Sequence, residues 1–365
     1  MALTPEETAR YRRHLSLPGF GPAAQERLKA ASVLVVGAGG LGCPALLYLA
    51  AGGVGRITVV DPDTVDASNL QRQILYTVAD QGANKAQAAA RRLLELNPLV
   101  RVEARPVRFD RGNALALVGA HDLVVDGSDN FSTRYLVNDA CVLAGRPFVY
   151  GAIQGFEGQV SVFNWRGGPT YRCLFPEPPE PGTVPNCAEA GVLGAVTGLI
   201  GTAQACEAIK VLAGVGEPLS GRLLIWNALA MTSSVVGLRK DPAGRAITEL
   251  PPEGYGEACE APEARDEMGA EELLRALESG TRVQLLDVRE GWERMMGSIE
   301  PSFHLPLGDL ETSSAAELGP LDPAVPTVVY CAAGIRSLRG IQILRQRHGF
   351  RSALSLRGGM KAWSR

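Results

Sequence analysis

Short apolar runs alternate with apolar helical segments along the first half of the chain. Residues 33–36 are valine and leucine, and they are followed by a glycine-rich turn, an apolar helical segment and a second apolar run that ends at Asp61. The pattern predicts a further helix from Lys85 to Asn97 and a further strand from Leu123 to Val125. Strands and helices that alternate in this way predict an α/β fold with a mostly parallel sheet.

Two other helices are predicted by different signals. Thr4, Pro5 and Glu7 have the spacing of a capping box with proline at the first helical position, so a helix is expected from Pro5 through Ser16. The longest uncharged run, residues 190–206, is short for a bilayer span and contains threonine and glutamine. We therefore expect a buried helix there and no contact with a membrane.

The alternation stops between residues 246 and 267, where proline, glycine and glutamate are frequent and no periodicity is visible. It restarts with a predicted helix at 270–278 and a predicted strand at 327–330. The chain is long enough for more than one core, so the pattern predicts two domains, residues 1–245 and 268–365, joined by a linker at 246–267. The second domain is expected to be a smaller α/β domain.

The composition is that of an ordinary globular protein. Of its 365 residues, 46% are hydrophobic and 21% are charged, and the formal net charge is −3. This charge gives no general attraction to nucleic acid or to a membrane surface, so neither is expected as a partner. The seven cysteines are scattered and the N-terminus has no signal-peptide pattern, which favours a cytoplasmic protein with reduced thiols. Cys43, Cys141 and Cys206 fall in apolar helical segments and are expected to lie in the core.

A glycine-rich turn follows the first predicted strand. Gly37, Gly39 and Gly42 form a GxGxxG pattern between this strand and the next helix. Glycines permit a tight turn and let phosphates approach the backbone N–H groups at the start of the helix, whose dipole favours anions. Asp61 ends the second strand, where a carboxylate can bond a ribose hydroxyl. The pattern predicts a Rossmann-like, doubly wound sheet that binds an adenine nucleotide.

Polar side chains that could serve such a ligand are concentrated in the segments after the strands. They are Ser68, Asn69, Arg72, Lys85, Asp129 and Asn130. The carboxyl ends of parallel strands are where open α/β sheets bind ligands. Asp129 could hold Mg²⁺ together with phosphate oxygens, although Asp129 and Asn130 could equally cap the following helix.

A carboxylate that attacks a phosphate in this site would need cationic side chains nearby. Two like unit charges repel by about 4 kcal/mol at about 4 Å in an effective dielectric of about 20. Arg13, Arg72, Lys85 and a metal ion on Asp129 would offset this repulsion, so that catalysis would consist of positioning and electrostatic stabilisation. Arg13 has a simpler alternative as part of a solvated basic helix face. Because the chain has no GxxxxGK[ST] motif, it is not expected to be a P-loop enzyme.

A second candidate site lies at the end of the predicted strand 327–330. The sequence CAAGIRS at 331–337 places Cys331 before several loop N–H groups and the start of a helix, and Arg336 adds positive charge. These surroundings favour a thiolate or a bound persulfide anion. A tyrosine-phosphatase-like loop is the alternative, but that loop separates its cysteine and arginine by one more residue than Cys331 and Arg336.

Five features of the N-terminal domain point to one family. They are GAGGLG at the glycine turn, SNLQRQ at 68–73, Lys85, SDN at 128–130 and TVPNCAEAGV around Cys187. Together they closely resemble the MoeB/ThiF class of ubiquitin-activating-like enzymes, over residues 1 to about 240. The resemblance implies that the domain uses ATP and Mg²⁺ to adenylate the C-terminal glycine of a ubiquitin-like sulfur-carrier protein of the MoaD/ThiS type, releasing pyrophosphate.

The same resemblance implies roles for individual residues. Those implied to hold the nucleotide are Gly40 and Asp61 on the adenosine and Ser68, Asn69, Arg72 and Lys85 on the phosphates. Asp129 with Asn130 would serve the metal and the ribose-phosphate side. Arg13 matches an arginine that family members extend into the partner subunit's ATP site, which implies a homodimer.

Two cysteine features of the family differ in their match. Cys187 matches a crossover-loop cysteine that in some relatives forms a thioester or mixed disulfide with the carrier, although a small core thiol is the alternative. Relatives also carry two Cys-x-x-Cys pairs that bind zinc, but here the first is reduced to Thr170 and Cys173 and the second is absent around 241–245. Because tetrahedral zinc needs four ligands, no structural zinc is expected.

Three motifs of the C-terminal domain point to a second family. They are LLDVRE at 285–290, CAAGIRS at 331–337 and LRGGMKAW at 356–363. Together they resemble a rhodanese domain covering residues 268–365, in which Cys331 would carry a sulfane sulfur received from a persulfide donor such as a cysteine desulfurase, or from thiosulfate. The HIPGA sequence usual in this family is altered to SIEPSFH.

The two resemblances together imply a cytoplasmic, homodimeric, two-step enzyme. The first domain would activate a carrier ending in Gly-Gly, and the Cys331 persulfide would then replace AMP to give a thiocarboxylate. Whether the carrier serves molybdopterin synthesis, thiamine synthesis or tRNA thiolation stays open. Two other functions also stay open: an NAD-dependent oxidoreductase, which would leave Arg72, Lys85 and the Cys331 loop without a role, and a non-catalytic scaffold.

Overall fold

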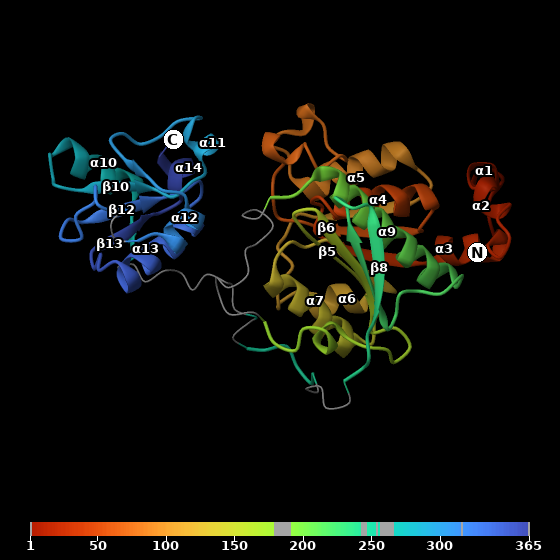
Figure 1. The fold of residues 1–365 in the computed structure, drawn as a ribbon. Coiled ribbons are helices and arrows are strands. Elements are labelled where there is room, and N and C mark those ends of the chain that lie inside the picture. The colour runs from red at the N-terminus through yellow and green to blue at the C-terminus, as the bar shows by residue number, and fades with distance from the viewer. Residues whose placement is uncertain are drawn as a thin grey trace. The chain divides into compact units, whose positions relative to one another are not determined.

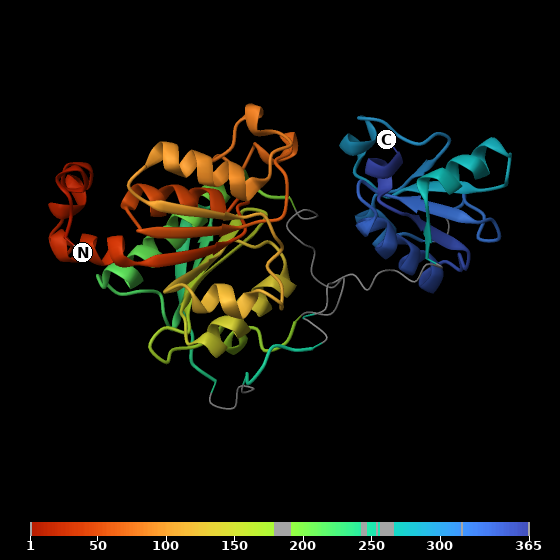
Figure 2. The ribbon, with the colours of Figure 1, turned by 180° about the vertical axis from the view of Figure 1, so that it is seen from behind.

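The computed structural model describes residues 2–178, 191–241, 247–252, 255, 266–314 and 317–363. They belong to two compact units, Met1–Glu257 and Ala258–Arg365, which Figures 1 and 2 show from opposite sides. Each unit has its own sheet and its own hydrophobic clusters. The predicted fold class, two α/β domains of which the first has a doubly wound sheet, is confirmed.

The sheet of the N-terminal unit has eight strands in the order β3-β2-β1-β4-β5-β6-β7-β8. The strands are β1 Ser32–Val36, β2 Arg56–Val60, β3 Arg101–Arg105, β4 Leu123–Asp126, β5 Phe148–Gln154, β6 Glu157–Phe163, β7 Arg222–Asn227 and β8 Thr232–Gly237. Strands β3 to β5 pair in parallel, whereas β5 to β8 pair antiparallel. From β1 the chain continues first to β2 and β3 on one side and then to β4 and β5 on the other. Because β1 and β4 are adjacent and parallel, the loops that follow them lie side by side at the carboxyl ends of the strands.

Helices cover both faces of this sheet. The helices of the unit, of which α4, α5, α6, α7 and α9 cover the sheet, are α1 Pro5–Arg10, α2 Arg12–Leu15, α3 Gly21–Ala30, α4 Gly42–Gly52, α5 Lys85–Leu96, α6 Ala114–Gly119, α7 Phe131–Ala144 and α9 Gly194–Ala213, with short 3₁₀ turns at Ala67–Asn69, Val78–Asp80 and Tyr171–Cys173. Alternate residues of β1 point to opposite faces: Val33 and Val35 pack with α4, α5 and α9, and Leu34 and Val36 pack with α6 and α7 (Figure 1).

The N-terminal helix begins as predicted but is interrupted. Thr4 and Glu7 form the capping box, with the Thr4 hydroxyl accepting the Glu7 N–H at 3.1 Å. The helix ends at Tyr11, whose ring is buried and whose hydroxyl accepts a hydrogen bond from Asn97 at 2.8 Å. The predicted continuous helix from Pro5 to Ser16 is therefore wrong, because the burial of Tyr11 divides it into α1 and α2.

Helix α9 occupies the predicted apolar run and is a core helix. Among the described helices it alone is long and apolar enough to cross a membrane, yet 50% of its apolar window is buried inside the unit. A Cβ atom on Gly201 would lie 2.3 Å from the carbonyl oxygen of Leu41, so α9 passes directly against the start of α4. The prediction of a buried Cys206 is wrong, because Ala205 and Glu207 are buried while Cys206 lies on the outer side of the helix. Cys43 and Cys141 are buried as predicted.

Described residues at both ends of the predicted linker, 246–267, contact the adjoining units. Leu250 is 4% exposed and packs with the residues around α7. The Tyr255 hydroxyl donates to Asp139 Oδ2 at 2.8 Å, and that carboxylate also accepts two hydrogen bonds from Arg172. At the other end, Glu267 already belongs to a strand of the C-terminal unit. Tertiary contacts thus draw both ends of the proline-rich segment into the two units.

The C-terminal unit contains a five-stranded parallel sheet in the order β11-β10-β12-β13-β9. Its strands are β9 Glu267–Met268, β10 Gln284–Asp287, β11 Phe303–His304, β12 Thr327–Tyr330 and β13 Ala353–Leu356, and its helices are α10 Ala270–Glu278, α11 Gly291–Arg294, α12 Leu307–Thr312, α13 Ile335–Arg347 and α14 Gly359–Trp363. Hydrophobic clusters on both faces bury β10 and β12. The central strand β12 ends immediately before Cys331.

Candidate functional site

Two glycines of the turn after β1 are required by backbone packing. Gly37 has a φ of +89°, and a Cβ atom on it would lie 2.8 Å from the carbonyl oxygen of Gly127 in the loop after β4. A Cβ atom on Gly42 would lie 2.0 Å from the carbonyl oxygen of Gly37. Because neither position admits a side chain, the turn and the loop after β4 can lie in direct contact.

The middle of the turn faces side chains instead. A Cβ atom on Gly39 would make an ordinary contact with Gln73 Nε2 at 3.6 Å, and one on Gly40 would lie 3.1 Å from Thr197 Cγ2. Gln73 is 4% exposed, and its Oε1 has no hydrogen-bond partner in the part of the chain that the structure describes. Packing inside the protein therefore does not require a glycine at position 39. A glycine there is consistent with the predicted approach of a phosphate to the backbone.

Asp61 braces this turn from the end of β2. It is 5% exposed, its Oδ2 accepts the Ala38 N–H at 2.8 Å, and its Oδ1 accepts the Asp63 N–H at 2.9 Å. Burial raises the pKa of Asp61 despite these hydrogen bonds. The carboxylate thus has a structural role beside the ribose contact that was predicted for it.

Lys85 is tied to the turn through Tyr76. The Tyr76 hydroxyl lies 2.8 Å from the carbonyl oxygen of Ala38 and 3.1 Å from that of Lys85, and it donates between them. The Lys85 side chain is 8% exposed, and its Nζ pairs with Asp63 Oδ2 at 3.0 Å. The backbone of Lys85 is therefore joined to the glycine turn through Tyr76, and its ammonium is paired with Asp63.

The segment containing Ser68, Asn69 and Arg72 also adjoins the turn. Ser68 and Asn69 are engaged locally, because the Ser68 hydroxyl donates to Asp66 Oδ1 at 2.6 Å and Asn69 Oδ1 accepts the Asp66 N–H at 3.2 Å. Arg72 Nη1 donates to the carbonyl oxygen of Ser68 at 3.2 Å. Thr197 links this segment to the turn, since its Oγ1 lies 3.5 Å from the carbonyl oxygen of Arg72 while its methyl group faces Gly40.

The loop after β4 brings Asp129 to the same place. Gly127 and Ser128 contact Gly37, and the Ser128 hydroxyl donates to Asp126 Oδ1 at 2.6 Å. Asp126 is fully buried, and this burial raises its pKa. Asn130 caps α7 by accepting the Thr133 N–H at 2.9 Å, so the capping alternative is confirmed for Asn130. Asp129 is exposed.

The segments that carry Arg72, Lys85 and Asp129 thus all adjoin the glycine turn, although the chemical role of each residue stays a prediction. Arg13 is exposed on α2. Cys187 lies outside the described residues.

Cys173 is bonded by backbone N–H groups of two different segments. Cys173 Sγ accepts the N–H groups of Thr170 and Asp241, both at 3.4 Å. Burial acts to raise the pKa of Cys173, but these hydrogen bonds outweigh it and the pKa is lowered. Among the described residues, no three His, Cys, Asp or Glu side chains gather in a possible metal site. The expected absence of zinc is testable by metal analysis of the purified protein.

The second site is the loop between β12 and α13. Cys331 is 1% exposed, and its Sγ accepts the Gly334 N–H at 3.1 Å and lies 3.5 Å from Ser337 Oγ. Gly334 has a φ of +96°, which turns its N–H toward the sulfur. A Cβ atom on Gly359 would lie 2.2 Å from the carbonyl oxygen of Cys331, so the glycine pair of the LRGG motif packs against this loop. The predicted sulfur site is therefore formed by N–H and hydroxyl groups around one cysteine.

Arg336 does not add free positive charge to this loop, contrary to expectation. Its Nη1 and Nη2 bond the two carboxylate oxygens of Glu293 at 2.7 and 2.6 Å. These bonds raise the pKa of Arg336. Burial acts to raise the pKa of Glu293, but the bonds to Arg336 outweigh it and the pKa is lowered. The charge of Arg336 is neutralised by a residue that the sequence did not single out.

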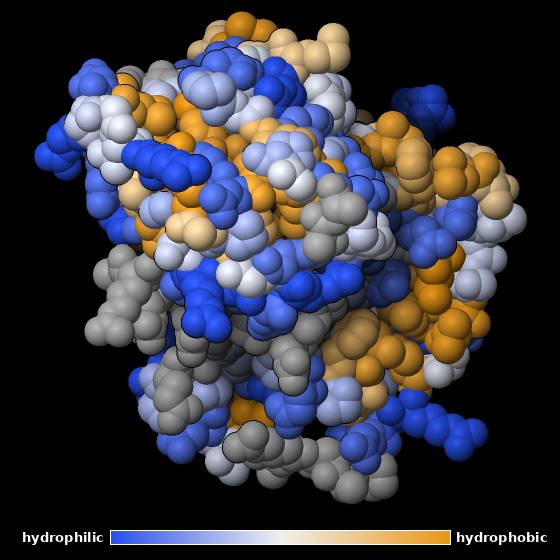
Figure 3. Space-filling model, turned by 60° about the vertical axis from the view of Figure 1, so that its left-hand side comes forward, coloured by the Kyte–Doolittle hydropathy of each residue, from blue (hydrophilic) through white to orange (hydrophobic). Residues whose placement is uncertain are grey.

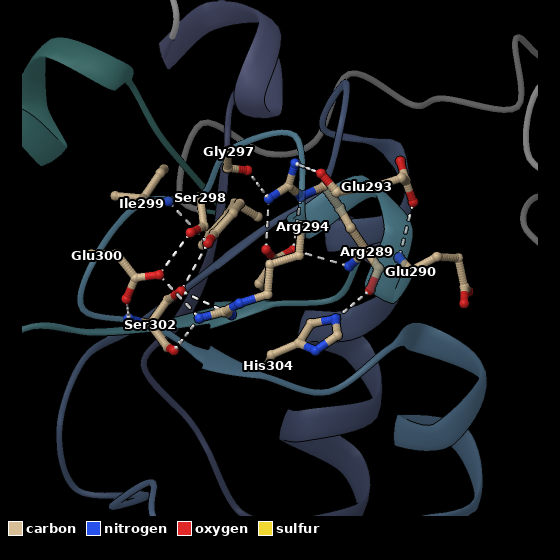
Figure 4. Close-up of polar contacts among 12 residues, drawn as sticks. Arg289, Glu290, Glu293, Arg294, Gly297, Ser298, Ile299, Glu300, Ser302 and His304 are labelled. Carbon is tan, nitrogen blue, oxygen red and sulfur yellow. Dashed lines mark hydrogen bonds and ion pairs between the residues drawn. The ribbon is translucent and has the colours of Figure 1, made fainter.

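Glu293, which lies in α11, belongs to a larger polar network of α11 and the segments on either side of it (Figure 4). Arg289 is bidentate on the buried Asp287 carboxylate at 2.9 and 2.7 Å and donates to the carbonyl oxygens of Glu293 and Gly297. Arg294 pairs with Glu300 at 3.1 Å. The network fixes the position of α11 next to the Cys331 loop.

Both sites lie in regions of the chain that match known protein families. Residues 11–245 match the ThiF family, and residues 269–365 match the rhodanese-like domain family. The chain belongs to the ThiF family. We therefore name Met1–Glu257 the ThiF unit and Ala258–Arg365 the rhodanese unit.

One relative that spans the whole chain and one that spans two thirds of it support this assignment. The probable adenylyltransferase/sulfurtransferase MoeZ of Mycobacterium tuberculosis is 45% identical over 376 residues, which cover 100% of this chain and 94% of MoeZ. The sulfur carrier protein adenylyltransferase of Thermus thermophilus is 57% identical over 247 residues, which cover 66% of this chain and 91% of the relative. The chain is an enzyme of the adenylyltransferase and sulfurtransferase class.

Solved structures agree on the fold of the ThiF unit. Escherichia coli MccB, crystallised with ATP, aligns with 64% of this chain and 73% of its own length at a TM-score of 0.55 and 23% identity. At this identity the likeness shows the fold alone.

Two residues of the two sites, Tyr76 and Glu293, were missed by sequence reasoning, whereas Gln73 was included in the SNLQRQ motif. Gln73 and Tyr76 lie within or just after the SNLQRQ motif, so the density of polar residues there was a usable signal. No sequence signal pointed to Glu293, because its partner Arg336 is distant in the sequence.

Proposed function

We propose that the ThiF unit uses ATP to adenylate the C-terminal glycine of a ubiquitin-like sulfur-carrier protein of the MoaD/ThiS type, and that the rhodanese unit supplies sulfur to give a thiocarboxylate. The observation that carries this proposal is that one chain holds both a glycine turn flanked by Arg72, Lys85 and Asp129 and a loop built around Cys331. A free carboxylate is a poor electrophile and AMP is a good leaving group, so activation precedes sulfur transfer.

Residues of the ThiF unit would act on ATP mainly by electrostatics. The backbone N–H groups at the start of α4, with Arg72 and Lys85, would hold the phosphates. Lys85 is already desolvated and paired with Asp63, so its ammonium needs little further ordering. Asp129 would hold Mg²⁺, which offsets the repulsion between the carrier carboxylate and the phosphates.

The ThiF unit also has a surface suited to a protein partner. Apolar residues exposed on β8, at the turn before it and at the β5–β6 turn are Phe156, Leu229, Met231, Val235 and Val236. Hydrophobic residues gather in patches on the face of the molecule shown in Figure 3. We propose that exposed apolar residues of the ThiF unit contribute to contact with the carrier, with Val235 and Val236 on opposite faces of β8.

The proposal includes a cytoplasmic homodimer in which Arg13 reaches the partner's ATP site, as its exposure on α2 permits. The outer sulfur of the Cys331 persulfide would attack the acyl-adenylate and expel AMP, forming an acyl disulfide. A second thiol would then attack Cys331 Sγ, form a disulfide with it and release the thiocarboxylate with the electron pair of the broken sulfur–sulfur bond. A small thiol reductant would then reduce that disulfide and restore the Cys331 thiol. Cys187 is our candidate for the second thiol.

The experiment that tests the function uses purified chain, ATP, Mg²⁺, a persulfide donor and recombinant carriers ending in Gly-Gly. We expect pyrophosphate exchange into ATP that depends on the carrier, and a carrier mass shift that corresponds to replacement of one oxygen by sulfur. Failure of exchange with every carrier, together with tight binding of NAD, would contradict the proposal and favour the oxidoreductase alternative.

A further inference from the structure

Lys85 occupies an unfavourable place for a cation. It is the first residue of α5, and no acidic residue lies in the first turn of that helix. The backbone N–H groups at a helix N-terminus carry partial positive charge, which repels an ammonium group. The Lys85 side chain is also only 8% exposed, so little water solvates its charge. An anion beside this ammonium offsets both costs, whether it belongs to the protein or to a ligand.

The protein supplies such an anion from Asp63. Asp63 Oδ2 lies 3.0 Å from Lys85 Nζ, and among the described residues the Asp63 carboxylate has no other hydrogen-bond or ion-pair partner. The Asp63 side chain is 65% exposed, against 8% for that of Lys85. The carboxylate therefore lies on the solvent side of the ammonium and covers it.

The backbone beside this ion pair is fixed by bonds that do not use the Asp63 carboxylate. The carbonyl oxygen of Asp63 accepts the Lys85 N–H at 2.9 Å and a hydrogen bond from Asn84 Nδ2 at 3.0 Å. The Asp63 N–H donates to Asp61 Oδ1 at 2.9 Å. The carboxylate can therefore turn into water without disturbing the backbone, and an exposed carboxylate loses little free energy when it leaves an ion pair.

We propose that Asp63 is a placeholder for phosphate, which pairs with Lys85 until a nucleotide phosphate binds the ammonium and displaces it. Two anions on one ammonium lie only about 4 Å apart and repel each other, so they do not share it comfortably. The phosphates of ATP carry more negative charge than a carboxylate and take its place. This inference rests on the phosphate-binding role proposed for Lys85.

The placeholder role sets how tightly phosphates are held. Each phosphate that binds Lys85 must first break the ion pair with Asp63, so the apparent affinity is lower than the ammonium alone would give. When pyrophosphate leaves, Asp63 returns to Lys85 and opposes its rebinding. Ion pairs and hydrogen bonds are exchanged in these steps, and no covalent bond changes.

The test is Asp63→Asn in the full chain, with titration calorimetry on three ligands. Asparagine has nearly the size of aspartate but no charge. The Kd values for pyrophosphate with Mg²⁺ and for ATP with Mg²⁺ should both fall at least about three-fold. The affinity for adenosine, which has no phosphate, should not change. A general disturbance of the site would instead weaken all three ligands.

Three further variants serve as controls. Asp63→Glu keeps a carboxylate on a side chain one methylene longer and should bind the phosphate ligands as the parent does. Glu95→Gln breaks an exposed ion pair with Arg92 on the same helix and should leave all three affinities unchanged. The double variant D63N/K85Q should lose the gain of D63N, because the ammonium that the first substitution frees is then absent.

An Asp63→Asn variant that folds and binds pyrophosphate no more tightly than the parent overturns the inference. An equal gain for adenosine also overturns it, because the effect of Asp63 would then not depend on phosphate.

Failure of the proposed function gives a different result. If every carrier fails to support pyrophosphate exchange into ATP but D63N still binds pyrophosphate more tightly, the adenylation is wrong and the placeholder role stands. If that carrier-dependent activity is present and D63N binds pyrophosphate as the parent does, only the placeholder role is wrong.

Discussion

Two single substitutions in the glycine turn, at Gly37 and Gly39, distinguish a glycine required for folding from one required for nucleotide binding. Alanine at position 37 would have to adopt a φ of +89°, a left-handed conformation that costs a non-glycine residue about 1–2 kcal/mol. Its methyl group would also press on the carbonyl oxygen of Gly127 at 2.8 Å, which is backbone and cannot turn aside. We expect Gly37→Ala to reduce the free energy of unfolding by about 3 kcal/mol and Tm of the ThiF unit by roughly 6–12 °C.

Alanine at position 39 meets only Gln73 Nε2 at 3.6 Å, an ordinary contact. We expect Gly39→Ala to change stability by no more than about 0.5 kcal/mol. The added methyl group lies where phosphates would approach the backbone, so the affinity for ATP should fall at least about ten-fold.

Calorimetric unfolding of the full chain measures the first effect, with the transition of the rhodanese unit as an internal reference. Titration calorimetry with ATP and Mg²⁺ measures the second. The reasoning is refuted if Gly39→Ala loses as much stability as Gly37→Ala, or if it binds ATP as tightly as the parent protein.

Three further predictions concern other contacts. Tyr255→Phe removes the hydroxyl that donates to Asp139 and should lower the free energy of unfolding of the ThiF unit by about 1 kcal/mol in urea titrations, with no change expected if Tyr255 is merely a linker residue. The pKa of Glu293 is lowered by folding, so its ion pair with Arg336 stabilises the rhodanese unit at pH values above 4.5, and this stability is lost as the pH falls through the lowered pKa. Glu293→Gln should therefore make the free energy of unfolding of the rhodanese unit less dependent on acid pH. An equal loss of stability at acid pH in the parent and the variant would contradict this prediction. Cys331→Ala should abolish sulfur transfer while carrier-dependent pyrophosphate exchange persists, and loss of both activities would show that the two units are not independent in chemistry.

Tertiary structure decided the features that depend on partners distant in sequence. Tyr76 bridges Ala38 and Lys85, and Glu293 neutralises Arg336, but no periodicity or motif encodes which side chains meet across a fold. The packing of the segment that follows residue 245 depends on the same kind of contact. A proline- and glycine-rich composition indicates a linker, whereas the burial of Leu250 depends on a pocket of the sheet's helical layer that exists only after folding.

The sequence by itself determined the features that depend on local geometry. Consecutive apolar residues defined β1 and β12, the capping box at Thr4 defined the start of α1, and GxGxxG defined the turn, because strand burial, helix capping and left-handed backbone are properties of a few adjacent residues. The same holds for the loop that follows Cys331, in which the hydrogen-bond donors come from the next few residues of the chain. The net charge of that loop, in contrast, could not be predicted from adjacent residues. It depends on the contact between Arg336 and Glu293 of α11, because a carboxylate must lie within a few ångströms of a guanidinium group to cancel its field.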